Sequence, residues 1–148
     1  MSNHSQNSRI VELFLFDIFV AIYKIQDILK DFKSSQELLF SYRDWDSVIR
    51  EFEIIGEASK HLLKANLIKN DYQVIVDFRN KIAHGYFGID ESVVWSIAHS
   101  DLKDFLQTIR SLILDIEPVL KQELLLAFEE DNKYLDFIVD ALKGLENG

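Results

Sequence analysis

The feature that most constrains this chain is the helical spacing of its apolar residues over long, uninterrupted stretches. From Arg9 to Phe32, apolar side chains recur every three to four residues, which is typical of one face of an α-helix. Leu13, Phe16 and Val20 belong to a second apolar line beside the first. A helix that is apolar over so much of its girth is either central in its own core or shared with a second copy of the chain. Homodimerisation through this helix is therefore one of two open interpretations.

Further segments with the same period follow, and few residues interrupt them. The chain of 148 residues holds one Pro and five Gly and is 48% hydrophobic, which disfavours turn-rich β folds and disorder. In the first half of the chain, helices are expected over 44–66 and from Asp71 to Gly85, with a short helical turn at 37–40. In the second half, a short helix is expected after Asp90, a longer one from Ser100 or Asp101 to 116, and a last one from Pro118 to 142 with a break near Asp131. Asp71 and Asp90 are suited to cap the helices that follow them. The sequence therefore predicts an all-α, antiparallel helical bundle with short connections.

The chain divides into three expected parts. Residues 1–8 are polar and are expected to be flexible, residues 9–116 form the bundle, and residues 117–148 form an additional C-terminal helical extension of the same domain. The extension carries apolar residues at helical spacing, with acidic residues outside them. A packed helical arm is the favoured interpretation. A contact with a partner protein or another copy is the alternative.

Composition excludes several classes of protein. Because the chain contains no cysteine, it has no disulfides, thiolate zinc sites or cysteine nucleophiles. The net charge of −9 argues against a protein that coats nucleic acid or anionic membranes. The most apolar segment, 10–23, contains Glu12 and Asp17, so it is too short and too charged to span a bilayer. We therefore expect a cytoplasmic protein with no membrane partner.

The least ordinary stretch of the sequence runs from 78 to 90. Arg79, Asn80, His84 and Tyr86 gather polar, reactive side chains at the end of a helix whose other face is apolar. Asn80 and His84 are four residues apart and hence neighbours on one face. Arg79 lies about 140° round the helix from His84, so the two flank that face. Two copies across a dimer axis could converge on one pocket more easily than one copy could.

These residue types suit metal-free cleavage of RNA. A histidine with an ordinary pKa of about 6.5 can move protons at neutral pH. An arginine can bind a phosphate through two donors and offset the charge that develops in the transition state. If the RNA 2′-hydroxyl attacks its own phosphate, neither metal nor cofactor is needed. No metal site is expected, since the four histidines lack ligand spacing: His4, His61, His84 and His99.

A structural interpretation of the same residues competes with this one. A histidine in the last turn of a helix is a favourable partner for the helix dipole. Arg79 and Asn80 would then belong to a solvated face, and Tyr86 would cover the core. His61 and His99 are expected to be surface or capping residues.

Three blocks of the sequence resemble the HepT-like toxins of the HEPN superfamily, the DUF86 family. Residues 79–86 match the R-x4-H-x-Y pattern, while 87–95 and the upstream Val-Ile-Arg-Glu-Phe-Glu-Ile-Ile-Gly-Glu-Ala block at 48–58 resemble the same family. The resemblance covers residues 9–116. It implies a HEPN-type bundle that acts as a homodimer, with a composite site at the dimer cleft. It also implies a toxin that cleaves cellular RNA, with tRNA a candidate, without metal or cofactor and with no DNA substrate.

The resemblance also assigns roles to residues. Arg79 and His84 would be the catalytic pair, with Asn80 in support. Toxins of this family are neutralised by an MntA-type minimal nucleotidyltransferase antitoxin, which transfers AMP from ATP onto the motif tyrosine, here Tyr86. A bulky anion there would block the phosphate site by occupancy and like charge. Assembly of toxin with antitoxin could exceed a dimer.

Arg50 and Lys81 are further candidates for lining the cleft. Arg50, Glu53 and Glu57 lie at i, i+3 and i+7 and share one helix face, where an ordinary salt-bridge ladder is the default expectation. The alternative is that Arg50 lines the cleft or orients Arg79. The segment 50–81 holds six Lys and Arg against five Asp and Glu, so the acidity of the chain lies outside the proposed site. That distribution suits a selective nuclease better than a general RNA-binding protein.

Two other classes of function stay open on the sequence. One is a non-catalytic HEPN module that binds substrate for a nucleotidyltransferase partner. The other, weaker one is a helical dimer whose site has decayed. The motif tyrosine and the block at 48–58 favour the toxin.

Overall fold

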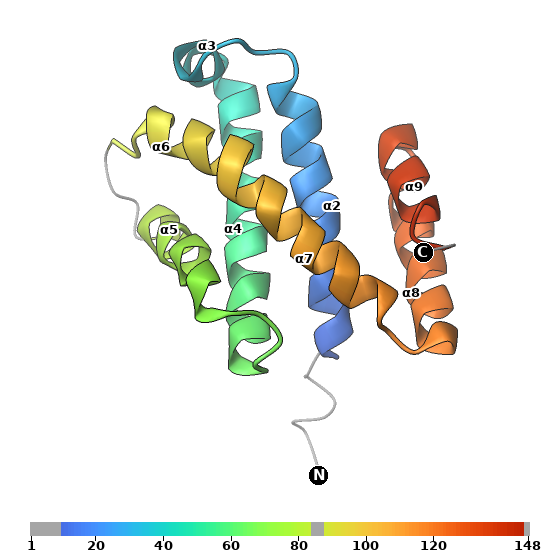
Figure 1. The fold of residues 1–148 in the computed structure, drawn as a ribbon. Coiled ribbons are helices and arrows are strands. Elements are labelled where there is room, and N and C mark those ends of the chain that lie inside the picture. The colour runs from blue at the N-terminus through green and yellow to red at the C-terminus, as the bar shows by residue number, and fades with distance from the viewer. Residues whose placement is uncertain (1–9, 84–87, 147–148) are drawn as a thin grey trace.

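The computed structural model describes residues 10–83 and 88–146 (Figure 1). Every regular element in this part of the chain is helical, so the predicted all-α fold is confirmed. The elements are α2 (Val11–Leu29), α3 (Ser35–Phe40), α4 (Tyr42–Lys64), the 3₁₀ turn η1 (Asn70–Tyr72), α5 (Gln73–Ala83), α6 (Glu91–Ser96), the π-helical turn η2 (Ile97–Asp101), α7 (Leu102–Leu114), α8 (Pro118–Asp131) and α9 (Asp136–Lys143). Within these residues, no helix is long and apolar enough to cross a membrane.

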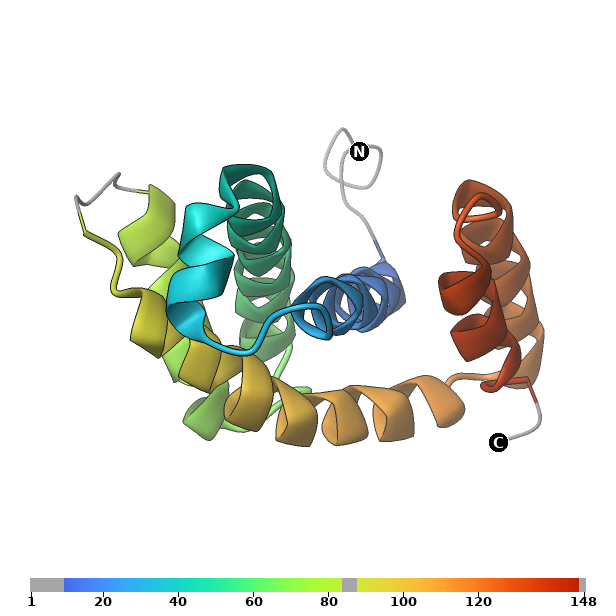
Figure 2. The ribbon, with the colours of Figure 1, turned by 90° about the horizontal axis from the view of Figure 1, so that it is seen from above.

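Helix α2 lies in the middle of the molecule. Helix α4 runs beside it, α7 crosses it, and the α8–α9 hairpin lies on the side away from α4 (Figures 1 and 2). Phe16, Phe19 and Ile22 of α2 are fully buried, and the ring of Phe16 stacks on Phe128 of α8 with centroids 5.0 Å apart. Packing within one chain, the first of the two interpretations, therefore accounts for most of the apolar surface of this helix, while Leu13, Phe14 and Tyr23 are only partly buried.

Helix α4 lies between α2 and α5 (Figure 1). Its amphipathic pattern buries Val48, Phe52 and Ile55, while its charged residues remain at least partly exposed. Phe52 meets Phe78 of α5 edge-on, with ring centroids 5.2 Å apart. This packing fixes α5, which carries the first half of the R-x4-H pattern, against the middle of α4.

The start of α5 differs from the prediction. Asp71 was expected to cap this helix, but it lies in η1 and α5 begins at Gln73. The next residue, Tyr72, explains the difference: its ring packs on Phe105 of α7 with centroids 4.4 Å apart, and its hydroxyl is 2.8 Å from Thr108 Oγ1. This tertiary contact holds the chain in a 3₁₀ turn before the helix.

Helices α6 and α7 also differ from the prediction. Asp90 caps α6 as expected, through its side chain and the backbone N–H of Ser92. No separate helix starts at Ser100 or Asp101, because the chain passes from α6 into α7 through the π-helical turn η2. Asp101 has helical dihedrals and makes no cap bond. His99 Nδ1 lies 2.8 Å from the carbonyl oxygen of Trp95, four residues back, so this histidine is bound to its own helix.

The C-terminal segment forms a two-helix arm that packs on α2. Pro118 opens α8, and the Glu117 carboxylate accepts hydrogen bonds from two backbone N–H groups at its start. The predicted break near Asp131 is confirmed, since α8 ends there and α9 returns beside it. The inner face of the arm is fully buried at Leu125, Ile138, Leu142 and Leu145. The arm is therefore part of the core.

Candidate functional site

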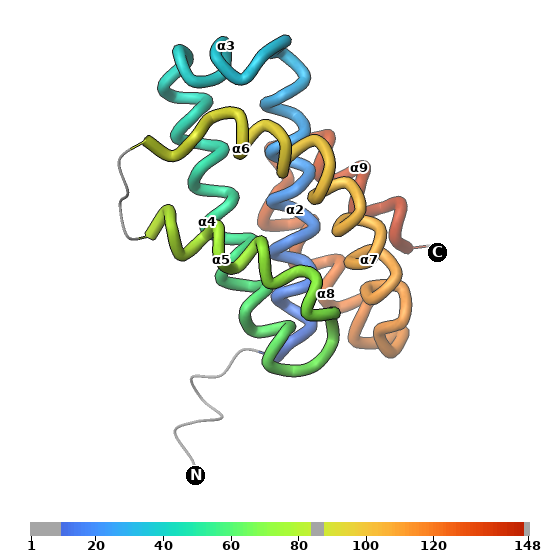
Figure 3. Tube along the Cα trace, turned by 60° about the vertical axis from the view of Figure 1, so that its left-hand side comes forward, coloured from blue at the N-terminus to red at the C-terminus, as the bar shows by residue number. Residues whose placement is uncertain are grey.

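The predicted catalytic segment is only partly within the described residues. Arg79, Asn80 and Lys81 occupy the last turns of α5, whereas His84 and Tyr86 lie outside the described residues. The end of α5 and the start of α6 lie at the same edge of the molecule (Figure 3). The structure therefore gives the geometry of the arginine side of the R-x4-H pattern.

Arg79 sits directly on the backbone of α4, at Gly56. Gly56 is buried, and a methyl group added to it would overlap the Cβ and Cγ atoms of Arg79 and lie 3.4 Å from the carbonyl oxygen of Ile75. Only glycine leaves room for this approach, because any other residue would push the arginine stem or α5 outward. The stem of Arg79 is thus confined between two helices.

The guanidinium of Arg79 contacts one acidic and one amide side chain. Its Nη2 atom lies 3.1 Å from Glu57 Oε1, and its Nη1 atom donates a long hydrogen bond of 3.4 Å to Asn80 Oδ1. Its Nε atom is buried without a hydrogen-bond partner among the described residues. The side chain is 28% exposed, so part of the guanidinium faces solvent. Such a group can bind an anion without first leaving its place in the structure.

Glu57 has a second neighbour, which the sequence interpretation left without a role. Its Oε2 atom lies 3.4 Å from His61 Nε2, one turn further along α4. The His61 ring stacks on Phe14 of α2, with centroids 4.3 Å apart and planes 5° from parallel. The Glu57–His61 spacing of four residues was visible in the sequence. The contact between Glu57 and Arg79 was not, because it joins two helices.

Lys81 lines a cavity at the end of α5. The cavity has a volume of about 380 Å³ and lies between residues that precede and follow the segment 84–87: Phe78, Lys81, Gly88, Ile89, Asp90 and Val93. Hydrogen bonds from the Ser92 side chain and backbone lower the pKa of Asp90, so this carboxyl is held as an anion by the start of α6. Asn80 and Lys81 are both exposed.

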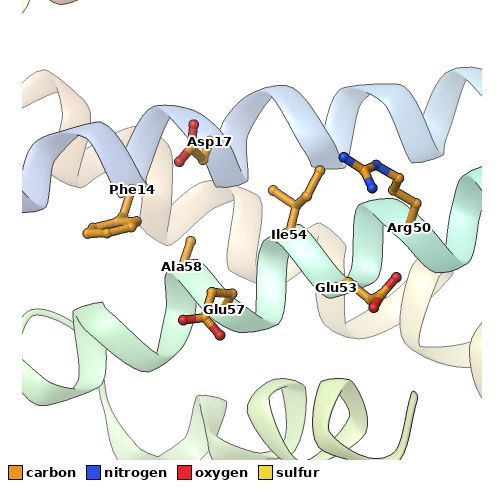
Figure 4. A pocket seen from close by; sticks show the side chains of 7 residues that line it. All are labelled: Phe14, Asp17, Arg50, Glu53, Ile54, Glu57 and Ala58. Atoms are coloured by element: carbon orange, nitrogen blue, oxygen red, sulfur yellow. The ribbon is translucent and has the colours of Figure 1, made fainter. Parts of the chain in front are cut away.

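Arg50 lies apart from Arg79. It lines a groove of about 420 Å³ between α2 and α4, together with six other residues: Phe14, Asp17, Glu53, Ile54, Glu57 and Ala58. Figure 4 shows Arg50 directed toward α2, whereas Glu57 points away from α2. Among the described residues, no ion pair joins Arg50 to Glu53 or Glu57, since Glu57 pairs with Arg79 and His61 instead. The expected salt-bridge ladder on α4 is therefore wrong.

The potential ligands for a metal ion are scattered in this part of the chain. Within residues 10–83 and 88–146, no three His, Asp or Glu side chains gather closely enough to hold one. The described arrangement at Arg79 is suited to binding a phosphate by charge and hydrogen bonding.

Comparison with known proteins identifies relatives over most of the chain. The model of a family described as "Ribonuclease HepT-like" matches residues 18–112, which end before α8. A protein of Methanocaldococcus jannaschii named "Putative RNase" is 32% identical over 110 residues, which cover 72% of this chain and 90% of the relative. A second protein of that organism with the same name is 30% identical over 114 residues, covering 74% of this chain and 96% of the relative.

An archaeal relative with a more specific name gives a similar match. A Thermococcus cleftensis protein named "Probable ribonuclease HepT" is 32% identical over 92 residues, which cover 60% of this chain and 83% of the relative. No solved structure gives a significant match.

Proposed function

Because the chain belongs to the Ribonuclease HepT-like family, we propose that it is a metal-independent endoribonuclease with Arg79 and His84 as its catalytic pair. The observation that carries the proposal is the placement of Arg79. Its stem is confined against Gly56 and its guanidinium is partly exposed at the end of α5. A fixed cation at the head of the R-x4-H pattern is suited to binding an RNA phosphate and stabilising charge in the transition state.

The proposed reaction uses the RNA 2′-hydroxyl as nucleophile. Its oxygen attacks the adjacent phosphorus and the bond to the 5′-oxygen breaks, giving a 2′,3′-cyclic phosphate and a 5′-hydroxyl. The 2′-hydroxyl proton leaves to a base and the departing 5′-oxygen receives a proton, and His84 is the group suited to transfer them. Arg79 stabilises the extra negative charge on the phosphate oxygens. Asn80, whose amide oxygen contacts Arg79, supports it.

We propose further that the active form is a homodimer with a composite site. Two copies of the R-x4-H pattern would then face one RNA strand, with Lys81 and Arg50 as candidates for lining the cleft. The substrate is cellular RNA in the cytoplasm, with tRNA a candidate, and neither DNA nor a membrane is involved. Among the described residues, Lys81 already lies on a cavity next to the motif, which supports its candidacy.

Regulation in this proposal is covalent. The chain is the toxin of a toxin–antitoxin pair, and its partner is a minimal nucleotidyltransferase. That partner transfers AMP from ATP to the Tyr86 hydroxyl, releasing pyrophosphate, and the added anion blocks the phosphate site. Co-expression with the partner should add multiples of the AMP mass to the peptide that contains Tyr86. An unmodified Tyr86 in a neutralised complex would contradict this part of the proposal.

The direct test is cleavage of RNA by protein purified without its partner. We expect cleavage to proceed in EDTA and His84→Ala to abolish it, because the proposed proton transfers need the imidazole and no metal. Thermal unfolding of both proteins controls for folding. Cleavage that requires added metal, or that survives the substitution, would overturn the proposal.

A non-catalytic binding module remains the second candidate, and one observation favours it: the guanidinium of Arg79 is already paired with Glu57. Expression in a sensitive host separates the two functions. Growth arrest that Arg79→Ala relieves would identify a toxin. Harmless expression of the wild type without any partner would favour the module.

A further inference from the structure

We propose that Glu57 is a positioning residue for Arg79, which fixes the guanidinium so that its remaining donors face the RNA phosphate. This role rests on the proposed function, in which Arg79 binds that phosphate. Glu57 lies on α4, in a different helix from the R-x4-H pattern, and the two residues meet only because α4 and α5 pack together.

The first argument is the freedom left to Arg79. Contact with Gly56 confines the Cβ and Cγ atoms of Arg79, whereas the outer part of this long side chain can still rotate. The contact between Nη2 and Glu57 Oε1 at 3.1 Å is the ion pair that restrains this outer part. With the stem and one terminal nitrogen held, the guanidinium plane has a defined direction.

The second argument is which donors remain. Nε is buried and Nη2 is taken by Glu57, so Nη1 is the terminal nitrogen with the weakest protein contact, a hydrogen bond of 3.4 Å to Asn80. A phosphate oxygen at Nη1 would replace or share that long bond. Glu57 therefore leaves one side of the guanidinium available to the substrate while it holds the other.

The third argument is that Glu57 is itself supported. Its other carboxylate oxygen lies 3.4 Å from His61, whose ring is stacked on Phe14. Residues of α2, α4 and α5 thus form one connected group that ends at Arg79. An ion pair that is partly exposed to solvent adds little to stability, so the effect of Glu57 should appear in catalysis far more than in unfolding.

Positioning predicts a particular pattern of kinetic constants. Removing Glu57 lets Arg79 turn away, which lowers kcat because the transition-state contact is lost. It also removes a negative charge next to the phosphate site, so KM should stay constant or fall. A residue that merely binds RNA would show the opposite pattern, with a raised KM and an unchanged kcat.

The test compares Glu57→Ala, Glu57→Gln and the matched control Glu53→Ala, which removes a carboxylate one turn earlier on the same groove. We expect Glu57→Ala to lower kcat about ten- to a hundredfold with no rise in KM. Glu57→Gln should recover most of the loss, because its amide oxygen can still accept from Nη2. Glu53→Ala should match the wild type. In an Arg79→Ala background, Glu57→Ala should have no further effect on kcat, since the two residues act as one unit.

A wild-type kcat in Glu57→Ala, an equal loss in Glu53→Ala, or fully additive effects in the double variant would overturn the positioning role. A second measurement does not depend on cleavage. In NMR spectra of protein with labelled arginine, the signal that Arg79→Lys removes belongs to Arg79 Nε–H. Its hydrogen exchange should accelerate about tenfold in Glu57→Ala, because a released side chain exposes the buried Nε.

These readouts separate the two proposals. If the wild type cleaves no RNA, the proposed function fails, and the exchange rate alone decides whether Glu57 fixes Arg79. If the wild type cleaves RNA but neither kcat nor exchange changes in Glu57→Ala, the positioning role fails and the proposed function stands.

Discussion

Two glutamates on this molecule have opposite kinds of neighbour. Glu57 on α4 lies between Arg79 and His61, within the region matched by the family, whereas Glu129 on α8 lies against Glu146, beyond that region. The first arrangement places a cation at the end of α5. The second brings like charges together on an arm that packs on α2. At the contact between α4 and α5, an ion pair holds a functional side chain in place. In the α8–α9 arm, apolar packing keeps the helices together although two carboxylates lie side by side.

The first test removes the cation at the end of α5. Arg79→Ala should lower RNA cleavage about a hundred- to a thousandfold, because it deletes a donor to the charge that develops in the transition state. Arg50→Ala is the matched control and should lose less than about tenfold, since Arg50 points toward α2 and is a candidate only for lining the cleft, whereas Arg79 is proposed to bind the phosphate. Initial cleavage rates measure both. Equal losses in the two variants would contradict the separation of the two arginines.

The second test concerns the arm. Leu125→Ala should lower the free energy of unfolding by about 2–4 kcal/mol, because this side chain is fully buried and its removal leaves a cavity. Leu126→Ala, at a side chain that is 57% exposed, should have almost no effect. Urea unfolding measures both. If Leu125→Ala unfolds like the wild type, the arm contributes nothing to the core.

The third test concerns the close approach of α5 to α4 at Gly56. Gly56→Ala should destabilise the protein by about 1–3 kcal/mol, because the added methyl group overlaps Arg79 and must push it or α5 away. Cleavage should fall together with stability, since the same displacement moves the guanidinium. Unfolding and cleavage are measured on one preparation. A stable and fully active Gly56→Ala protein would show that the close approach of the two helices is not needed.

The smallest effect is expected at Glu129. Burial and the neighbouring Glu146 raise the pKa of the Glu129 carboxyl. A group whose folded-state pKa is raised contributes stability below its unfolded pKa and loses that contribution as the pH rises through the folded pKa. Glu129→Gln should therefore be more stable than the wild type at neutral pH, by less than about 1 kcal/mol because solvent screens the pair.

The pH series supplies the control for this prediction. The difference between Glu129→Gln and the wild type should vanish below about pH 3, where the carboxyl is protonated in both states. Denaturant midpoints across the series measure it. A difference that grows toward low pH would have the wrong sign and would contradict the assignment.

Local signals predicted most of the fold. Apolar spacing predicted α2 and α4, Asp90 indicated the start of α6, and the polar residues near Asp131 indicated the break in the arm. Two predicted helix starts are wrong, and a tertiary contact explains the first of them. Tyr72 packs on α7 and holds Asp71 in a 3₁₀ turn, and η2 joins α6 to α7 where a new helix was expected.

Only the part of the site that depends on local spacing could be predicted from the sequence. Residues 79–81 stand on the last turns of α5, and that follows from spacing along one helix. The ion pair between Glu57 and Arg79 joins two helices, and one sequence does not specify which residues of two helices will meet. Gly56 lies in a block whose resemblance to the family was visible, but its physical reason, the close approach of Arg79, required the packing of α4 on α5.

The central claim is that RNA is cut by its own 2′-hydroxyl at the Arg79–His84 pair. The most direct measurement is the chemistry of the product ends, taken by mass spectrometry after cleavage by the wild type in EDTA. We expect a 2′,3′-cyclic phosphate on one fragment and a 5′-hydroxyl on the other, with neither formed by Arg79→Ala. Fragments that carry a 3′-hydroxyl and a 5′-phosphate would mean that water, not the 2′-hydroxyl, attacks the phosphorus, and would contradict the account.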